Sequence, residues 1–217
     1  MKNIKTLILL SASFGPTLLG GSFYLNSVTD TGATVQYSDN SYTAIGDHIT
    51  LGSTGLATDA TAQFFNVSPT SGIFDATLRL YSVGVSPSVL GALLGTYTVT
   101  NIPITGFDIS NPLTTGTTTV KFSGLNINVP TELIFMISLA NVTNADLGLT
   151  LFDPPTVGSS DNSSFIADSG SGASVISTDP GFGNVNFELI QTPEPGTISL
   201  LGGGLALLGF AIRRKRV

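Results

Sequence analysis

The middle of the chain is divided into short apolar runs that are separated by Gly, Pro, Asn and Asp. Several runs alternate apolar and polar side chains, as in Asn184 to Leu189, where Val185, Phe187 and Leu189 share one face. A period of two is typical of a half-buried strand, and regular breaks rich in turn residues predict strands joined by tight turns. The run from Leu133 to Ile137 is apolar throughout, which predicts a central strand covered on both faces.

Two further runs place a lone cation between apolar neighbours, Arg79 within Leu78–Leu80 and Lys121 within Val120–Phe122, so both cations are expected on outward faces. No stretch before residue 197 shows a helical period. About ten strands with short turns predict an all-β fold, a two-sheet sandwich of jelly-roll-like form. The remaining strands are expected at Thr34 to Tyr37, Ile45 to Leu51, Ala60 to Val67, Thr96 to Ile102, Ile104 to Ile109 and Leu147 to Leu151.

The N-terminal segment has the parts of a secretory signal. Lys2 and Lys5 come first, an apolar run from Leu7 to Leu10 follows, and small residues come next at Ser11, Ala12 and Ser13. A basic start, a short apolar run and small residues are typical of a cleaved signal peptide. We therefore expect a signal peptide over residues 1–21, cut between residues 13 and 22, and an exported β-sandwich body over residues 22–191.

The C-terminal segment, residues 192–217, contains three parts in order. A Pro-Glu-Pro motif holds the backbone extended, because proline fixes φ and restricts the residue before it. An uncharged run from Thr197 to Ile212 follows, and as a helix its roughly 16 residues would span about 24 Å, close to the thickness of a bilayer core. Four cations close the chain and should stay cytoplasmic, so we expect a C-terminal transmembrane helix with the body outside.

These three parts resemble the PEP-CTERM sorting signal of Gram-negative bacteria, although Thr192 stands where valine is commonest. The resemblance implies processing by a membrane protease-transferase called exosortase, and an association with exopolysaccharide and biofilm. Two body segments, Phe74 to Tyr81 and Leu151 to Asn162, also resemble uncharacterised PEP-CTERM surface proteins, which offer no catalytic residues to carry over. The resemblance assigns the sorting motif to Pro193, Glu194 and Pro195, and the stop-transfer cluster to Arg213, Arg214, Lys215 and Arg216.

The distribution of charge excludes nucleic acid as a partner. Of fourteen acids, only Glu194 lies outside the stretch from Ser22 to Thr192, which leaves thirteen acids against Arg79 and Lys121, a net charge of −11. Such a body repels the phosphates of DNA and RNA. Cysteine is absent, so the chain has no thiolate metal site and no disulfide.

Catalytic chemistry is not expected. His48 is the single histidine, and no Gly-x-Ser-x-Gly motif accompanies it. Most acids stand beside Gly, Pro or Asn, where turn formation explains them. No cofactor is expected, although a structural calcium ion stays open, because carboxylates in a loop-rich region suit it. The candidates for that ion are Asp146, Asp153, Asp161 and Asp168.

The function that the sequence favours is therefore structural or adhesive, at the cell surface or in the extracellular matrix. The alternative is a carbohydrate-binding module that serves an exopolysaccharide, with Tyr37 and Tyr42 as an aromatic platform near Asp39 and Asn40. Ice binding is a further alternative, but it needs a regular array of threonines, and the run from Thr114 to Thr119 is a cluster without a repeat.

Overall fold

A computed structural model describes the body of the protein, in the ranges 21–38, 41–86, 89–110, 115–161, 164–177 and 183–191. The expected signal peptide up to residue 20 and the expected C-terminal helix within 192–217 lie outside the described residues. One compact unit extends from Ser22 to Gln191. The described ranges contain strands and turns but no helix, and so none that is long and apolar enough to cross a membrane.

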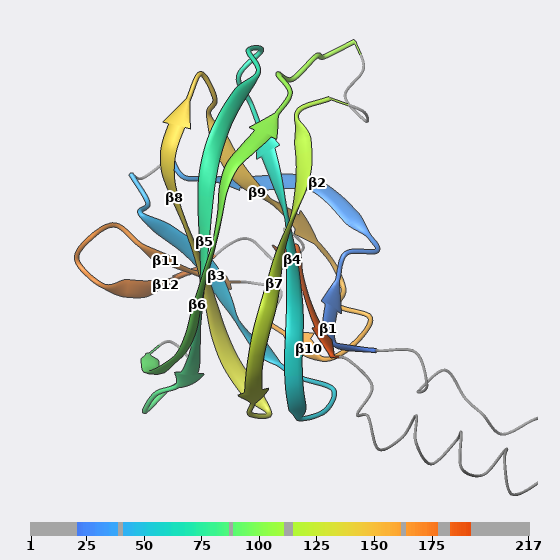
Figure 1. Ribbon diagram of the computed structural model, residues 1–217, viewed down its shortest axis with the longest axis vertical. Coiled ribbons are helices and arrows are strands. Elements are labelled where there is room, and N and C mark those ends of the chain that lie inside the picture. The colour runs from blue at the N-terminus through green and yellow to red at the C-terminus, as the bar shows by residue number, and fades with distance from the viewer. Residues whose placement is uncertain are drawn as a thin grey trace, which may run out of the picture. The chain divides into compact units, whose positions relative to one another are not determined.

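The described residues form fourteen strands. Figure 1 shows them as two layers of extended, twisted ribbon. In chain order they are β1 (Ser22–Asn26), β2 (Asp30–Gln36), β3 (Ala44–Thr50), β4 (Gly55–Asn66), β5 (Gly72–Val83), β6 (Leu90–Ile104), β7 (Thr117–Val129), β8 (Glu132–Thr143), β9 (Leu147–Phe152), β10 (Ser159–Ser160), β11 (Ser164–Asp168), β12 (Ala173–Ser177), β13 (Asn184–Val185) and β14 (Phe187–Gln191).

The strands pair into two antiparallel sheets of seven strands each. In the first, sheet A, β4 pairs with β7 along one edge and with β14 and β9 along the other, and β1 and β2 pair in turn with β14 and β9. In the second, sheet B, the order is β12–β11–β3–β8–β5–β6, and β10 extends the edge of β3 beside β11. The expected all-β class with two sheets is confirmed.

Most strands that follow one another in sequence lie in opposite sheets. The chain passes from β2 in sheet A to β3 in sheet B, then to β4 in A and β5 in B, and after the β5–β6 hairpin it alternates again through β7, β8 and β9. Each of these connections therefore crosses an end of the sandwich. As a result, the connections of several strands meet at the same end of the fold.

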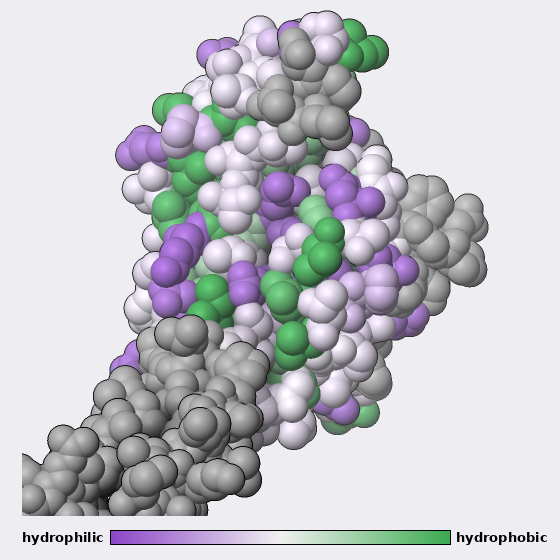
Figure 2. All heavy atoms as spheres, turned by 90° about the vertical axis from the view of Figure 1, so that its right-hand side faces the viewer, coloured by the Kyte–Doolittle hydropathy of each residue, from purple (hydrophilic) through white to green (hydrophobic). Residues whose placement is uncertain are grey.

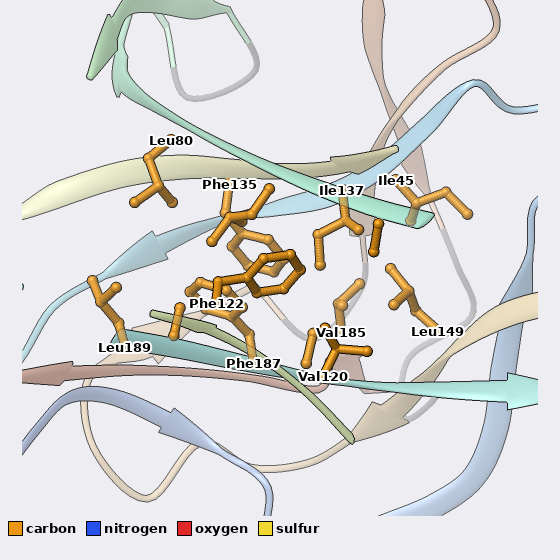
Figure 3. Packing of buried hydrophobic residues seen from close by; sticks show 14 of the residues in the cluster. Ile45, Leu80, Val120, Phe122, Phe135, Ile137, Leu149, Val185, Phe187 and Leu189 are labelled. Carbon is orange, nitrogen blue, oxygen red and sulfur yellow. The ribbon is translucent and has the colours of Figure 1, made fainter. Parts of the chain in front are cut away.

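The core lies between the two sheets and is built from aromatic pairs that join them. Phe187 of sheet A stacks on Phe135 of sheet B with ring centroids 3.9 Å apart and planes 8° apart. Phe64 and Phe74 form a second pair across the sheets at 5.0 Å. All four rings are fully buried, and Figure 3 shows Phe187 and Phe135 at the centre of the aliphatic side chains. Such pairs contribute about 0.5–1.5 kcal/mol each beyond burial of their area.

Most of the expected strands are present, with one error and one refinement. The expected strand from Ile104 to Ile109 is wrong, because β6 ends at Ile104 and the chain then folds over the β4–β5 connection. There the backbone N–H of Phe107 donates to the carbonyl of Ser68 at 2.9 Å, and its ring packs on Phe65 at 5.2 Å. In β9 both faces are buried, including the glycine and threonine that alternate with its leucines.

Candidate functional site

A pocket of about 420 Å³ opens at one end of the sandwich, between the β2–β3 connection and the β8–β9 connection. It combines an apolar floor with hydroxyl groups, tyrosine rings and one carboxylate. The lining residues are Tyr37, Ser38, Tyr42, Thr43, Leu139, Val142, Ala145, Asp146 and Leu147. Pockets of this size accommodate small molecules or the end of a polymer chain.

The two tyrosines of the pocket differ in accessibility. Tyr37 is 9% exposed, and its hydroxyl donates to the backbone carbonyl of Ile137 at 2.8 Å. Burial raises the pKa of Tyr37 well above its ordinary value. Tyr42 is half-buried and meets Phe165 edge to face at 6.1 Å, which fixes its ring. The expected platform of two exposed rings is therefore wrong for Tyr37, and its neighbours at positions 39 and 40 lie outside the described residues.

The carboxylate of the pocket belongs to Asp146, and both the side chain and the backbone of this residue are hydrogen-bonded. The hydroxyl of Ser38 donates to Asp146 Oδ1 at 2.8 Å. The backbone N–H of Asp146 donates to Asn66 Oδ1 at 3.0 Å, and the carbonyl of Asp146 accepts from the backbone of Val67 at 2.9 Å. Asp146 is thus tied both to the β2–β3 connection and to the end of β4, which gives the carboxylate a defined position.

Asn66, which the sequence analysis did not single out as a functional residue, organises this end of the fold. Its side chain is fully buried and donates to the carbonyls of Thr70 and Thr105 at 2.9 and 3.1 Å. Its Oδ1 accepts from the backbone of Ser68 as well as Asp146. One signal was available, because Asn66 continues the inward alternation of β4 after Phe64, and a polar residue in that register needs internal partners.

The four aspartates considered for calcium each make contacts of their own. Asp146 bonds Ser38, as described above. Asp161 accepts from the hydroxyl of Ser164 at 3.2 Å, and Asp168 accepts from the backbone of two glycines in the β11–β12 turn. Asp153 follows β9, where its N–H donates to the carbonyl of Thr29. Within the described ranges, no group of three or more His, Asp or Glu side chains is placed to hold a metal ion.

His48 and its neighbour Asp47 point to opposite sides of β3. His48 Nε2 lies 3.5 Å from Glu132 Oε2 on the outer side of sheet B. Asp47 shares the inward register of Ile45 and Ile49 and is 2% exposed. Its Oδ1 accepts from the backbone of His48 at 2.8 Å, whereas its Oδ2 is buried with no partner among the described residues. Burial raises the pKa of Asp47 well above its ordinary value, although the hydrogen bond from His48 acts in the opposite direction, and the nearby charge of Asp161 adds a smaller rise.

The threonine cluster considered for ice binding is divided by a turn. Thr115 bonds the backbone of Asp108 before the turn, and Thr117 and Thr119 are exposed at the start of β7. Thr114 lies outside the described residues. The cluster therefore spans two different local structures instead of one flat row.

Comparison with known proteins identifies the C-terminal segment. Residues 191–216 match the family model of the PEP-CTERM protein-sorting motif. The chain carries a PEP-CTERM sorting signal. This signal implies export, sorting at the membrane and processing by exosortase. The matched range begins at Gln191, the last residue of β14, and includes the Pro-Glu-Pro motif and the cationic cluster. No curated protein and no solved structure matches the chain, so the resemblance of the two body segments to other surface proteins has no support.

Proposed function

We propose that the protein is a non-catalytic, structural or adhesive β-sandwich that a PEP-CTERM tail delivers to the cell surface or the extracellular matrix. The observation that carries this proposal is the sorting-motif match at residues 191–216, which follows directly on a compact β body. The order of the central strands, β2–β9–β4–β7 against β3–β8–β5–β6, supports a jelly-roll form, which is common among capsid and lectin domains.

The placement of the ionisable residues favours a role without catalysis. His48 lies beside Glu132 on the outer side of a sheet, and the aspartates near the loops bond turn residues. On the face in Figure 2, hydrophobic side chains form several groups interspersed with hydrophilic ones. Hydrophobic side chains scattered in this way are ordinary on a protein surface and favour no single docking site on this face.

The three parts of the tail have different roles in this proposal. Pro193, Glu194 and Pro195 form the motif that exosortase reads, and the apolar run holds the chain in the membrane during processing. The terminal cations resist translocation and stop the chain. An association with exopolysaccharide and biofilm would follow from the same sorting route.

The test compares full-length chains in a bacterial host that makes an exosortase. The wild type should appear as two bands, the smaller shorter by about 20 residues, as expected for cleavage just before a membrane-spanning run. Glu194→Ala should accumulate as the larger, membrane-bound band, whereas Glu132→Ala, an exposed acid of the body, should be processed as the wild type is. If wild type and Glu194→Ala both stay full length, the tail is a simple anchor and the sorting role is wrong.

A second candidate is a carbohydrate-binding module, and the pocket at the end of the sandwich favours it. A half-buried tyrosine ring, Tyr42, lies in one lining with the Asp146 carboxylate and the hydroxyls of Ser38 and Thr43. An aromatic face suits the C–H face of a pyranose, and the polar groups suit its hydroxyls. The acidic charge of the body favours a neutral saccharide over an anionic one.

A glycan array tests the second candidate. Binding of the wild type that Tyr42→Ala and Asp146→Asn each abolish would support it. Tyr81→Ala is the control, since Tyr81 is a half-buried tyrosine of β5 that does not line the pocket. A silent array with the wild type would favour the structural role.

A further inference from the structure

The last strand of the body, β14, is hydrogen-bonded along both edges. It pairs with β1 through residues 187–190 and with β4 through residues 187–191. Ser22, at the start of β1, is paired with Ile190, and its hydroxyl also bonds the carboxylate of Glu188. A strand inside a sheet cannot be freed without breaking both ladders, unlike an edge strand.

Buried side chains hold the same strand to the core. Phe187 and Leu189 are fully buried, and Phe187 makes the stacked contact with Phe135 of sheet B. Just before β14, the Asn186 amide donates to the carbonyl of Asn26 at 3.1 Å. The buried Asn26 amide in turn donates to the carbonyls of Phe152, Asn184 and Val185 at 3.0–3.3 Å. These contacts connect β14 and its approach to β1 and β9.

The sorting motif begins where this strand ends. The family match starts at Gln191, and Thr192 alone separates Gln191 from Pro193. Two residues of fully extended chain span at most about 7 Å. A domain of about 170 residues has a radius of gyration of about 15 Å. While β14 stays paired, Pro193 is therefore tethered within about 7 Å of a folded body that is several times wider.

An enzyme that binds a peptide usually takes several residues in extended form, often as an added strand. Of the residues before Pro193, those at 187–190 pair with both β1 and β4, and Gln191 pairs with Ala57 of β4. The same residues cannot serve both partners at once. Binding by the processing enzyme and completion of the sheet therefore compete for the end of β14.

We infer that the folded body restrains its own processing, so that exosortase cleaves efficiently only after the end of β14 has left sheet A. This inference rests on the proposed sorting function and concerns its regulation. Local opening of a strand end is less costly than global unfolding, so the native body remains a substrate but a slow one.

The test measures how fast the full-length chain is converted to the processed form in a pulse-chase experiment, in a host that makes an exosortase. The decisive variant has six residues, Gly-Ser-Gly-Ser-Gly-Ser, inserted between Gln191 and Thr192. It leaves every residue of the body unchanged and moves the motif away from it. The matched control has the same insertion after Gly170, in the exposed β11–β12 turn, where nothing lies within 4 Å of the position that a side chain of residue 170 would take.

We expect the insertion before Thr192 to raise the rate of conversion about tenfold, equivalent to removing an opening cost of about 1.4 kcal/mol. The control insertion should leave the rate unchanged. A companion pair truncates two fully buried leucines of sheet A: Leu189→Ala in β14 should raise the rate, whereas Leu149→Ala in β9 should raise it less.

The outcomes separate this inference from the function on which it rests. If the wild type is cleaved and the insertion before Thr192 leaves the rate of conversion equal or lower, the inference is overturned. That result is expected if the chain is processed before β14 docks in the sheet. If neither the wild type nor the variant with the insertion before Thr192 is cleaved in that host, the sorting function is refuted, and the inference with it. The inference is supported if the insertion before Thr192 raises the rate of conversion and the insertion after Gly170 does not.

Discussion

Replacing Asp47 by asparagine should change the free energy of unfolding of the body in a pH-dependent way. As pH rises from acidic to neutral, the variant should gain stability relative to the wild type. The carboxyl lies among core residues of β3, with one buried oxygen that lacks a partner in the described part of the chain. Asparagine has nearly the same size and retains the acceptor for the backbone N–H of His48. The substitution therefore removes the titration of this side chain with little change in packing.

The sign follows from the direction of the pKa shift. Burial raises the pKa of Asp47 in the folded state above its ordinary value of 3.8. Between that value and the raised pKa, the folded state binds one proton more than the unfolded state. The free energy of unfolding must then fall as pH rises, by about 1.4 kcal/mol per pH unit. Above the raised pKa the free energy of unfolding falls no further, and below pH 3.8 this decrease is absent.

The Asp47→Asn body lacks this term, so its advantage over the wild type should grow with pH across the window. For a domain of this size, about 1 kcal/mol corresponds to about 2–4 °C in melting temperature. The difference in melting temperature should thus widen by about 3–5 °C per pH unit above pH 3.8. Circular dichroism melts of residues 22–191 in a series of buffers from pH 3 to pH 8 would measure it.

Asp75→Asn provides a control of opposite sign. The Asp75 carboxylate accepts from the backbone N–H of Asn101 at 2.7 Å and from the side-chain amide of Asn141 at 2.6 Å, and these bonds lower its pKa. The hydrogen-bonded Asp75 carboxylate stabilises the wild type above the ordinary pKa, and this contribution is lost as pH falls through the lowered pKa. Asp75→Asn should therefore be less stable than the wild type mainly toward neutral pH. A difference between Asp47→Asn and wild type that stays constant from pH 4 to pH 7 would refute the burial argument.

Three further outcomes are expected for the isolated body. Asn66→Asp should destabilise it by about 2–4 kcal/mol in urea denaturation, because a carboxylate would face two carbonyls that now accept hydrogen bonds from the amide. The control Asn128→Asp, at an exposed position of β7, should have little effect. Phe187→Ala should cost about 3–5 kcal/mol, and a double-mutant cycle with Phe135→Ala should give a coupling of about 1 kcal/mol; additive effects would contradict the stacked contact. Millimolar calcium should leave the melting temperature unchanged, since no three acidic side chains of the described ranges are grouped to hold an ion, and a rise of several degrees would show that they gather around one.

Local pattern was sufficient for those parts of the fold in which a strand's environment depends on its own residues. The apolar run of β8 is buried on both faces, as its sequence indicated, and the alternation before Gln191 gave the inward positions of Phe187 and Leu189. Lys121 is on an outward face, as its apolar neighbours indicated. These inferences succeed because side chains alternate across a strand whatever its partners are.

Prediction failed where a distant segment decides the local structure. The expected strand after Ile104 is replaced by a loop, because Phe107 bonds Ser68, far away in the chain, in preference to a strand partner. Tyr37 was expected to be exposed, yet its hydroxyl bonds Ile137 of the other sheet. The pocket, with Tyr42 and Asp146 in one lining, joins residues about a hundred positions apart, and no spacing rule could have found it.

The sequence alone determined the sorting signal, because its motif, apolar run and cations are contiguous and are read as a linear chain by the membrane and the processing enzyme. It also determined the all-β class, since a period of two is a local property of the chain. The tertiary structure alone decided which strands are neighbours. It placed β14 between β1 and β4, buried Asp47 among apolar side chains, and made Asn66 the link between three connections. The physical reason is that burial and hydrogen bonding depend on contacts between segments far apart in sequence, which become defined only when the two sheets close on one another.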